Sequence, residues 1–279
     1  VSPQMITQAE DILNQFTDNP RKDNSLLEQL FALLPRKMKN VADYLLPADA
    51  EPEQIQNVID RETDLLRMME TQMQALPSND SKEKTLLEEW NLSITPVNNE
   101  KELRQIKRHM GHSADCFSKA FRVKNSNRDN AFWNYYDKHN YHKEDIHYWY
   151  HGSRNMNCLS ILHNGLILNP KAPKVGHMFG YGIYLAPKAK KSIGYTSLNG
   201  SFWVHGTSDT AYLFVMKTVY KSPYHVYTWT SGMKSLTKSR ISPHDAVFAH
   251  AGTSLRNDEV VIFDDAQVTL QYIIELKQQ

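Results

Sequence analysis

The sequence predicts an α+β protein, in which an all-helical N-terminal bundle is followed by a domain built around a mainly antiparallel β-sheet. Up to about residue 76, apolar residues recur every three or four positions, which is the spacing of one buried helix face. From residue 148 onward they gather instead in short runs rich in Val, Ile, Phe and Tyr, the residues that favour strands. These runs follow one another without regularly interleaved helices, a pattern that favours an antiparallel sheet over a doubly wound parallel one.

Four amphipathic helices are expected in the first 76 residues. The first begins at Ser2 and Pro3, a capping residue followed by the proline that is favoured at the first helical position. The second covers residues 26–34 and the third residues 41–46, and a proline follows each of them. A longer fourth helix runs from Pro52 to Leu76. Because short connections join these segments, they predict a small helical bundle.

The composition changes at residues 77–81, a polar and turn-rich stretch without apolar anchors. We place a domain boundary there, which gives a helical domain over residues 1–78 and a second domain over residues 82–279.

The second domain is expected to begin with a strand at residues 92–97 and a helix that Asn99 and Glu102 start as a capping-box pair. A strand near residues 117–123 and an aromatic helix around residues 132–136 follow. The later strands are expected at residues 148–153, 211–220, 246–251, 259–264 and 268–276. In the last of them apolar residues alternate with more polar ones, which predicts a half-buried strand.

The composition limits the class of protein. With 41% hydrophobic and 23% charged residues, the 279-residue chain can bury a sizeable core. Its formal net charge of +1 argues against a strong general attraction to nucleic acid, and the sequence has no recognisable DNA-reading module. Basic clusters at residues 104–108 and 188–191 leave weak nucleic-acid contact as an alternative.

No apolar run reaches the roughly 18 residues of a membrane helix, and no signal segment opens the chain. We therefore expect an intracellular protein, cytoplasmic or nuclear, without membrane contact.

Neither the cysteines nor the histidines form a metal-binding pattern. Cys116 and Cys158 are the two cysteines and lie far apart, which argues against a disulfide framework and a cysteine zinc finger. His139, His142 and His147 lie close together, but polar residues interleave them and the spacing of zinc motifs is absent. We therefore expect no metal site.

Three polar residues far apart in the sequence each stand at the edge of a strand-like apolar run. His151 ends the first of these runs and begins the tripeptide His-Gly-Ser. Tyr184 closes the segment Gly-Tyr-Gly-Ile-Tyr, and Ser192 and Tyr195 follow on an expected helix. Glu259 opens a strand near the C-terminus. This distribution predicts a polar site that tertiary folding assembles.

As an ordered set, these motifs resemble the catalytic domain of the poly(ADP-ribose) polymerases, the His-Tyr-Glu branch of the ADP-ribosyltransferases. The resemblance extends to Met-Phe-Gly at residues 178–180 and to Ala-Gln-Val at residues 266–268, and it covers residues 90–276. It implies an ADP-ribosyltransferase domain with a split, mainly antiparallel sheet. It also implies a metal-free reaction in which NAD is the substrate, nicotinamide is released, and ADP-ribose passes to protein acceptors, the chain itself included.

The resemblance assigns the catalytic roles to three residues. Glu259 would hydrogen-bond the 2′-hydroxyl of the nicotinamide ribose and place negative charge beside the oxocarbenium-like transition state. It would also polarise an incoming ribose hydroxyl when chains of ADP-ribose are built. His151 would hydrogen-bond a ribose hydroxyl on the adenosine side and so position the substrate. Tyr184, together with Tyr195, would bracket the cationic nicotinamide ring, an attraction of about 0.5–2 kcal/mol.

Other matched positions would complete the NAD site. Gly152 would bring main-chain N–H and C=O groups to the carboxamide of nicotinamide, where a side chain would intrude. Ser192 would contact the same carboxamide, and Ser153 would reach the adenosine ribose. Further matches to the family are Asn157, Ser160 and, on the acceptor side, Lys191.

Two departures from the family concern the adenine end. Ile167 stands where family members often carry an arginine, and the donor-site loop at residues 169–177 looks short. The N-terminal helices resemble a shortened form of the family's regulatory helical domain. That resemblance implies that they shield the NAD site and restrain activity.

Alternative activities fit the same residues. A polymer-forming enzyme, a mono-ADP-ribosyltransferase, an NAD glycohydrolase and a catalytically silent reader of NAD or ADP-ribose would share one pocket. A reader has no need of Glu259, so the sequence favours an enzyme. Among the enzymes we expect a poly(ADP-ribose) polymerase, because Glu259 permits polymer formation. The acceptor site that polymer formation requires is not visible in the sequence, so the mono-transferase and the glycohydrolase stay as alternatives.

Overall fold

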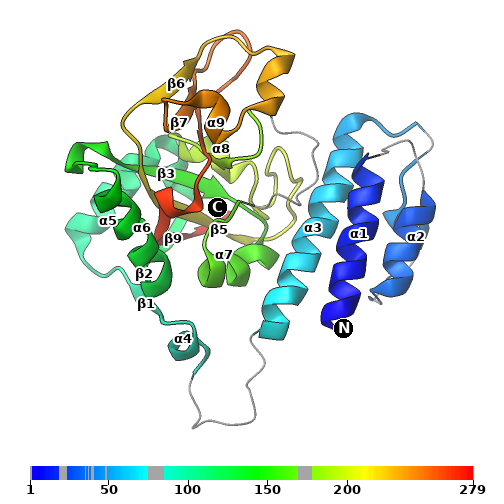
Figure 1. The fold of residues 1–279 in the computed structure, drawn as a ribbon. Helices are drawn as coiled ribbons and strands as arrows, with labels where there is room; N and C mark the ends of the chain where they lie inside the picture. The colour runs from blue at the N-terminus through cyan, green and yellow to red at the C-terminus, as the bar shows by residue number, and fades with distance from the viewer. Residues whose placement is uncertain are drawn as a thin grey trace. The chain divides into compact units, whose positions relative to one another are not determined.

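The computed structural model describes residues 2–18, 24–34, 36, 38, 41–47, 49–74, 85–168 and 178–278. The described residues form two compact units, a helical one up to residue 74 and a larger one from residue 85 onward (Figure 1). The larger unit combines short helices with two sheets.

Among its described residues, the helical unit has three α-helices. They are α1 (Pro3–Asp18), α2 (Asn24–Leu33) and α3 (Pro52–Gln74). Ser2 caps α1 as predicted, since its hydroxyl accepts a hydrogen bond from the Met5 N–H at 3.3 Å. The three helices share one apolar core, whose buried members include Leu13, Phe16, Leu27, Leu30, Ile59 and Leu66.

The expected third helix at residues 41–46 is wrong, because Val41–Tyr44 forms one turn of 3-10 helix instead. The cause is a tertiary contact. The Asn24 side chain donates to the Leu46 carbonyl and accepts from the Leu46 N–H, both at 2.9 Å. The Leu46 N–H is thereby engaged by Asn24 and not by the carbonyl four residues earlier, as an α-helix over residues 41–46 would require. The prediction of a four-helix bundle is therefore supported only in part.

Two sheets form in the part of the chain that the structure describes from residue 85 onward. The first has the order β1 (Leu92–Pro96), β2 (Phe117–Asn125), β9 (Val268–Lys277), β5 (Thr210–Val219), β3 (Ile146–Gly152). The second has the order β4 (Ile183–Leu185), β8 (Glu259–Ile262), β7 (Ala246–Ala249), β6 (Pro223–Val226). All neighbouring strands are antiparallel except β6 and β7. The predicted α+β fold with mainly antiparallel strands is confirmed, although β6, of which only Val226 is buried, was not predicted.

Short helices accompany the sheets. They are α4 (Leu86–Glu89), α5 (Glu100–Met110), α6 (Ser126–Lys138), α7 (Cys158–Asn164), α8 (Ala189–Ile193) and α9 (Lys238–Ile241). Asn99 begins α5 as predicted, because its side chain accepts from the Glu102 N–H at 3.0 Å. The predicted capping box is only half formed, since the Glu102 side chain binds Tyr272 and Arg122 instead. The Glu102 carboxylate accepts from the Tyr272 hydroxyl on β9 at 2.7 Å, so this side chain ties α5 to the first sheet.

Strand β9 is buried on both faces, so the prediction of a half-buried strand is wrong. It lies between β2 and β5 in the middle of the first sheet. A register shift against β5, between Val215 and Met216, also interrupts the alternation. As a result Thr269 and Ile273, which the pattern places on the more polar face, are only 2% and 7% exposed. Neither the central position nor the register shift is visible in the local pattern.

The two sheets meet at an isolated β-bridge between Tyr150 of β3 and Ala186, the residue after β4. Each residue donates its N–H to the carbonyl of the other at 2.9 Å. Tyr150 is 1% exposed, and its hydroxyl lies 2.8 Å from Nδ1 of His109 on α5. The bridge therefore sets how the end of β3 lies against the end of β4.

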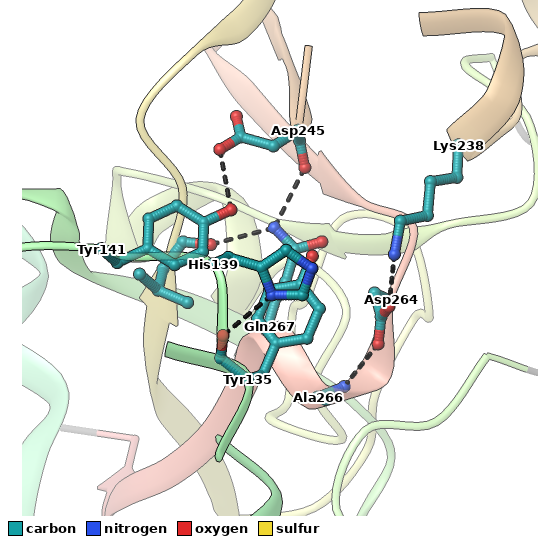
Figure 2. Close-up of polar contacts among 9 residues, drawn as sticks. Tyr135, His139, Tyr141, Lys238, Asp245, Asp264, Ala266 and Gln267 are labelled. Atoms are coloured by element: carbon teal, nitrogen blue, oxygen red, sulfur yellow. Dashed lines mark hydrogen bonds and ion pairs between the residues drawn. The ribbon is translucent and has the colours of Figure 1, made fainter. Parts of the chain in front are cut away.

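A buried amide joins the two sheets at another place. Gln267, which is 1% exposed, donates from Nε2 to the carbonyls of Val219, at the end of β5, and Asp245, before β7, both at 3.0 Å. Figure 2 shows this amide beside Asp245, whose carboxylate accepts from the Tyr141 hydroxyl at 2.9 Å. Burial and the neighbouring carboxylate raise the pKa of Tyr141, so its hydroxyl stays a donor. One strand of each sheet is thus held by the same side chain.

Replacing this amide should loosen the connection between the sheets. Gln267→Leu keeps a similar volume but removes both donors from buried carbonyls. We expect the free energy of unfolding to fall by about 2–3 kcal/mol in a urea titration followed by tryptophan fluorescence. The control Gln271→Leu, at a half-buried position on β9, should change it by less than about 1 kcal/mol. Equal stability of Gln267→Leu and wild type would contradict the role of the amide.

Candidate active site

The bridge between Tyr150 and Ala186 brings the sequence-predicted residues together. His151 directly follows Tyr150 on β3, and Tyr184 lies two residues before Ala186 on β4. Strand β4 pairs antiparallel with β8, with Leu185 opposite Val260, and one step further along this register Glu259 lies beside Ala186. The His, the Tyr and the Glu that the sequence singled out therefore lie around one junction, although they belong to different sheets.

The His151 ring is held in place at the end of β3. Its Nδ1 lies 3.1 Å from the carbonyl oxygen of Tyr184. The ring also lies against Phe214, with 6.4 Å between the ring centroids. A proton on Nδ1 makes the contact with Tyr184 a hydrogen bond in which the imidazole donates. The contact between the two sheets therefore fixes the orientation of this histidine.

Gly152 lies against the main chain of Ser192 on α8. A Cβ atom at residue 152 would overlap the Ser192 carbonyl group, so the close approach requires glycine. Ser192 is 4% exposed, and its hydroxyl donates to the Tyr150 carbonyl at 3.0 Å. Because the hydroxyl proton is engaged, the Ser192 oxygen suits a ligand N–H better than a ligand carbonyl.

Hydrogen bonds at the hydroxyl fix the Tyr184 side chain. The hydroxyl donates to the carbonyl of Gly180 at 2.8 Å and accepts from the N–H of Phe179 at 2.9 Å. Burial raises the pKa of Tyr184 above its ordinary value, and the nearby Glu259 carboxylate raises it further. The hydroxyl therefore stays protonated, and the ring keeps one orientation.

Tyr195 lies just after α8 and is 38% exposed. Its ring stacks on that of Trp203, with 5.8 Å between centroids and 19° between planes. The Tyr184 ring is thus fixed within the fold, and the Tyr195 ring lies at the surface.

Glu259 forms an ion pair with Lys191 of α8, between Oε1 and Nζ. The side chains are 12% and 11% exposed, so both charges are largely withdrawn from water. A carboxylate buried to this degree is costly without an opposite charge beside it. The resemblance pointed to Lys191 only as an acceptor-side position. Its pairing with Glu259 has no local signal, because the two residues are distant in the sequence.

The residues expected on the adenosine side lie where β3 leads into α7. Asn157 is 5% exposed, and its Nδ2 donates to Oγ of Ser153 at 2.7 Å. Among the described residues, Asn157 Oδ1 is buried without a hydrogen-bond partner. Ser160 lies on the following turn, within α7, and is half-buried. A buried acceptor of this kind is suited to a ligand hydroxyl.

Ile167, the residue that departs from the family pattern, lies beyond α7 and is 46% exposed. The expected donor-site loop at residues 169–177 lies outside the described residues. The altered adenine end therefore stays a prediction.

Within the described ranges, no group of three or more His, Cys, Asp or Glu side chains is placed to hold a metal ion. His139 instead stacks on Tyr135 at 4.0 Å, and His147 stacks on Tyr220 at 4.2 Å. Burial raises the pKa of Cys158 to about 12, as for a thiol that packs rather than reacts. Every helix in the described part of the chain is too short or too polar to span a bilayer.

Two mainly antiparallel sheets that meet beside a His, a Tyr and a Glu define the class of fold as that of the His-Tyr-Glu ADP-ribosyltransferases. The family model of the poly(ADP-ribose) polymerase catalytic domain matches residues 100–278. The chain therefore belongs to the poly(ADP-ribose) polymerase family.

Curated relatives agree at moderate identity. The poly(ADP-ribose) polymerase of Drosophila melanogaster is 31% identical over 147 residues, which cover 46% of this chain and 15% of the relative. Poly(ADP-ribose) polymerase 1 of Gallus gallus is 31% identical over 153 residues, covering 46% of this chain and 14% of the relative. Poly(ADP-ribose) polymerase 2 of Arabidopsis thaliana is 25% identical over 225 residues, which cover 68% of this chain and 34% of the relative. The matched part is thus a small fraction of each relative's length.

The hydrogen bonds of Tyr184 lead to a test that does not depend on the reaction. Tyr184→Phe keeps the ring but removes the partner of the Phe179 N–H and the Gly180 carbonyl. We expect the free energy of unfolding to fall by about 1–2 kcal/mol in chemical denaturation. Tyr227→Phe, at a residue that is 67% exposed, is the matched control and should change it by less than about 0.5 kcal/mol. If both variants were as stable as wild type, the hydroxyl would not fix the ring.

Proposed function

We propose that this chain is an NAD-dependent ADP-ribosyltransferase. It cleaves the bond between nicotinamide and ribose in NAD and transfers ADP-ribose to protein acceptors, itself included. The observation that carries the proposal is the buried ion pair of Glu259 and Lys191, which lies at the sheet junction with His151 and Tyr184. Membership of the poly(ADP-ribose) polymerase family supports the same reaction.

The nicotinamide end of NAD binds between α8 and the end of β3. Gly152 offers main-chain groups to the carboxamide, and the Ser192 oxygen accepts a carboxamide N–H. Tyr184 and Tyr195 stack on the two faces of the ring. Because the ring is cationic until the bond breaks, aromatic faces hold the substrate more strongly than the neutral product.

The adenosine end binds near the start of α7. His151 and Ser153 hydrogen-bond ribose hydroxyls there, and Asn157 keeps Ser153 in position. The buried Asn157 Oδ1 gives a ligand hydroxyl an acceptor that the described part of the protein leaves unused.

Bond cleavage moves the electron pair of the C1′–N bond onto nicotinamide, which leaves as a neutral molecule. The remaining ribose carries positive charge as an oxocarbenium-like species. Glu259 accepts a hydrogen bond from the 2′-hydroxyl and places its negative charge beside C1′. An acceptor oxygen then forms the new bond to C1′. Where the acceptor is a hydroxyl, its proton passes to the Glu259 carboxylate and from there to solvent. In this reaction the 2′-hydroxyl joins or replaces Lys191 at the carboxylate.

The role of the carboxylate is tested by Glu259→Gln. We expect nicotinamide release to fall by about 100- to 1,000-fold, the size of effect seen when one electrostatic stabiliser of a transition state is lost. NAD binding, measured by calorimetry, should change by less than about 5-fold, since the amide keeps a hydrogen-bond acceptor. Asp258→Asn, at the adjacent acidic residue, is the matched control and should retain turnover. Wild-type turnover in Glu259→Gln would refute the proposed role.

Incubation of the wild-type chain with labelled NAD distinguishes the alternatives. A ladder of products on the protein identifies a polymer-forming enzyme, and one discrete added mass identifies a mono-transferase. Free ADP-ribose identifies a glycohydrolase, and intact NAD that remains bound identifies a silent reader. We expect label on the protein, because a reader has no use for Glu259 and Lys191 as a buried pair.

The helical unit is proposed to restrain this activity, in keeping with its resemblance to the family's regulatory helical domain. Deleting residues 1–78 should then raise the rate of nicotinamide release by at least about 3-fold, which corresponds to about 0.6 kcal/mol in the activation free energy. Circular dichroism and a thermal melt of the shortened chain serve as the control for folding. An unchanged rate in a folded, shortened chain would contradict the proposal.

A further inference from the structure

Tyr195 is followed by a loop, leading from α8 to β5, whose aromatic rings pack in a row that starts at the Tyr195 ring. Trp203 stacks on Tyr195, and Phe202 meets Trp203 edge-on, with 4.7 Å between centroids and 88° between planes. The guanidinium of Arg256 lies over the Phe202 ring, 5.9 Å from its centroid. We call Tyr195, Trp203 and Phe202 the aromatic stack. It begins at Tyr195, a proposed wall of the nicotinamide site, and ends at Phe202, over which Arg256 lies.

The loop that carries Trp203 is closed by its own hydrogen bonds. Leu198 and Ser208 form a β-bridge at its base, and the Asn199 N–H donates to the Ser208 carbonyl at 2.8 Å. Within the loop, the Gly206 N–H donates to Oγ of Ser201 at 2.8 Å. Trp203 is therefore presented by a closed loop with a defined conformation.

Trp203 also approaches the main chain next to Tyr195 closely. The main-chain N–H of Trp203 donates to the carbonyl of Gly194 at 2.9 Å. A Cβ atom on residue 194 would come within 3.0 Å of Trp203 Cδ1, which is closer than ordinary packing allows. Glycine at this position lets the indole lie directly against the chain that carries Tyr195.

The stack lies at the surface of the protein. Tyr195, Trp203 and Phe202 are 38%, 39% and 59% exposed, so each ring keeps a substantial area open to water. The stack restricts the orientation of the Tyr195 ring, because the Trp203 ring lies stacked against it. Ordering a free side chain upon binding costs affinity, and ordering it beforehand recovers that affinity.

We propose that Trp203 is a positioning residue, which holds the Tyr195 ring in the orientation that stacks on nicotinamide. The inference rests on the proposed function, since it takes Tyr195 as one wall of the NAD site. Arg256, whose guanidinium lies over Phe202, stands three residues before β8, the strand that Glu259 begins.

The test is a comparison of Trp203→Ala, Trp203→Phe and wild type. An aromatic pair of this kind corresponds to about 2- to 10-fold in a binding constant. Trp203→Ala should therefore raise the KM for NAD and weaken NAD binding in calorimetry by about that factor, with kcat changed by less than about 2-fold. Trp203→Phe should restore most of the loss, because a flat ring can still stack. Trp133→Ala, at another tryptophan that is 41% exposed, is the control and should leave both values unchanged.

A double-mutant cycle shows whether Trp203 acts through Tyr195. In the Tyr195→Leu background, Trp203→Ala should have no further effect on NAD binding. The inference would be overturned if Trp203→Ala had the same KM and the same affinity for NAD as wild type. It would also be overturned if the losses of affinity caused by Trp203→Ala and Tyr195→Leu were additive in the double variant. If the wild-type chain binds NAD without releasing nicotinamide, the transferase proposal fails, while weaker binding by Trp203→Ala still supports the positioning role. A wild-type chain that does not bind NAD overturns both.

Discussion

A pair of main-chain hydrogen bonds between Tyr150 and Ala186 fixes the geometry on which the site depends. Each sheet carries only part of the candidate site, with His151 on the first sheet and Tyr184 and Glu259 on the second. The bridge uses backbone groups, so the relation between the sheets does not depend on a particular pair of side chains at this point. Burial of the Tyr150 side chain then protects the bridge from water.

The sequence predicted those parts of the fold that local patterns determine. Helix starts at Ser2 and Asn99 follow from capping chemistry within one turn, and the strands of the larger unit follow from runs of strand-forming residues. The helix expected before Leu46 is missing because a distant asparagine takes the backbone groups of that residue. The burial of β9 could not be predicted either, because it depends on which strands lie beside it.

The candidate site was predictable to a similar extent. Its members were found because motifs at strand ends, taken in order, resemble a known family. The contacts among these residues could not be predicted, because such contacts arise between segments that only the fold brings together. The pairing of Lys191 with Glu259 is one such contact, and the stack of Trp203 on Tyr195 is another. Motif order can name the residues of a site, but it carries no information about which charges and rings touch.

The ion pair of Lys191 and Glu259 also restricts how the protein can evolve. Losing one partner of a buried pair leaves the other charge without compensation, at a cost of about 3–5 kcal/mol. That is a large share of the roughly 5–15 kcal/mol that keeps a typical domain folded. A substitution at either residue therefore lowers stability as well as turnover, so variants that lose activity through this pair also become less tolerant of further destabilising changes. Replacing both residues together avoids the uncompensated charge.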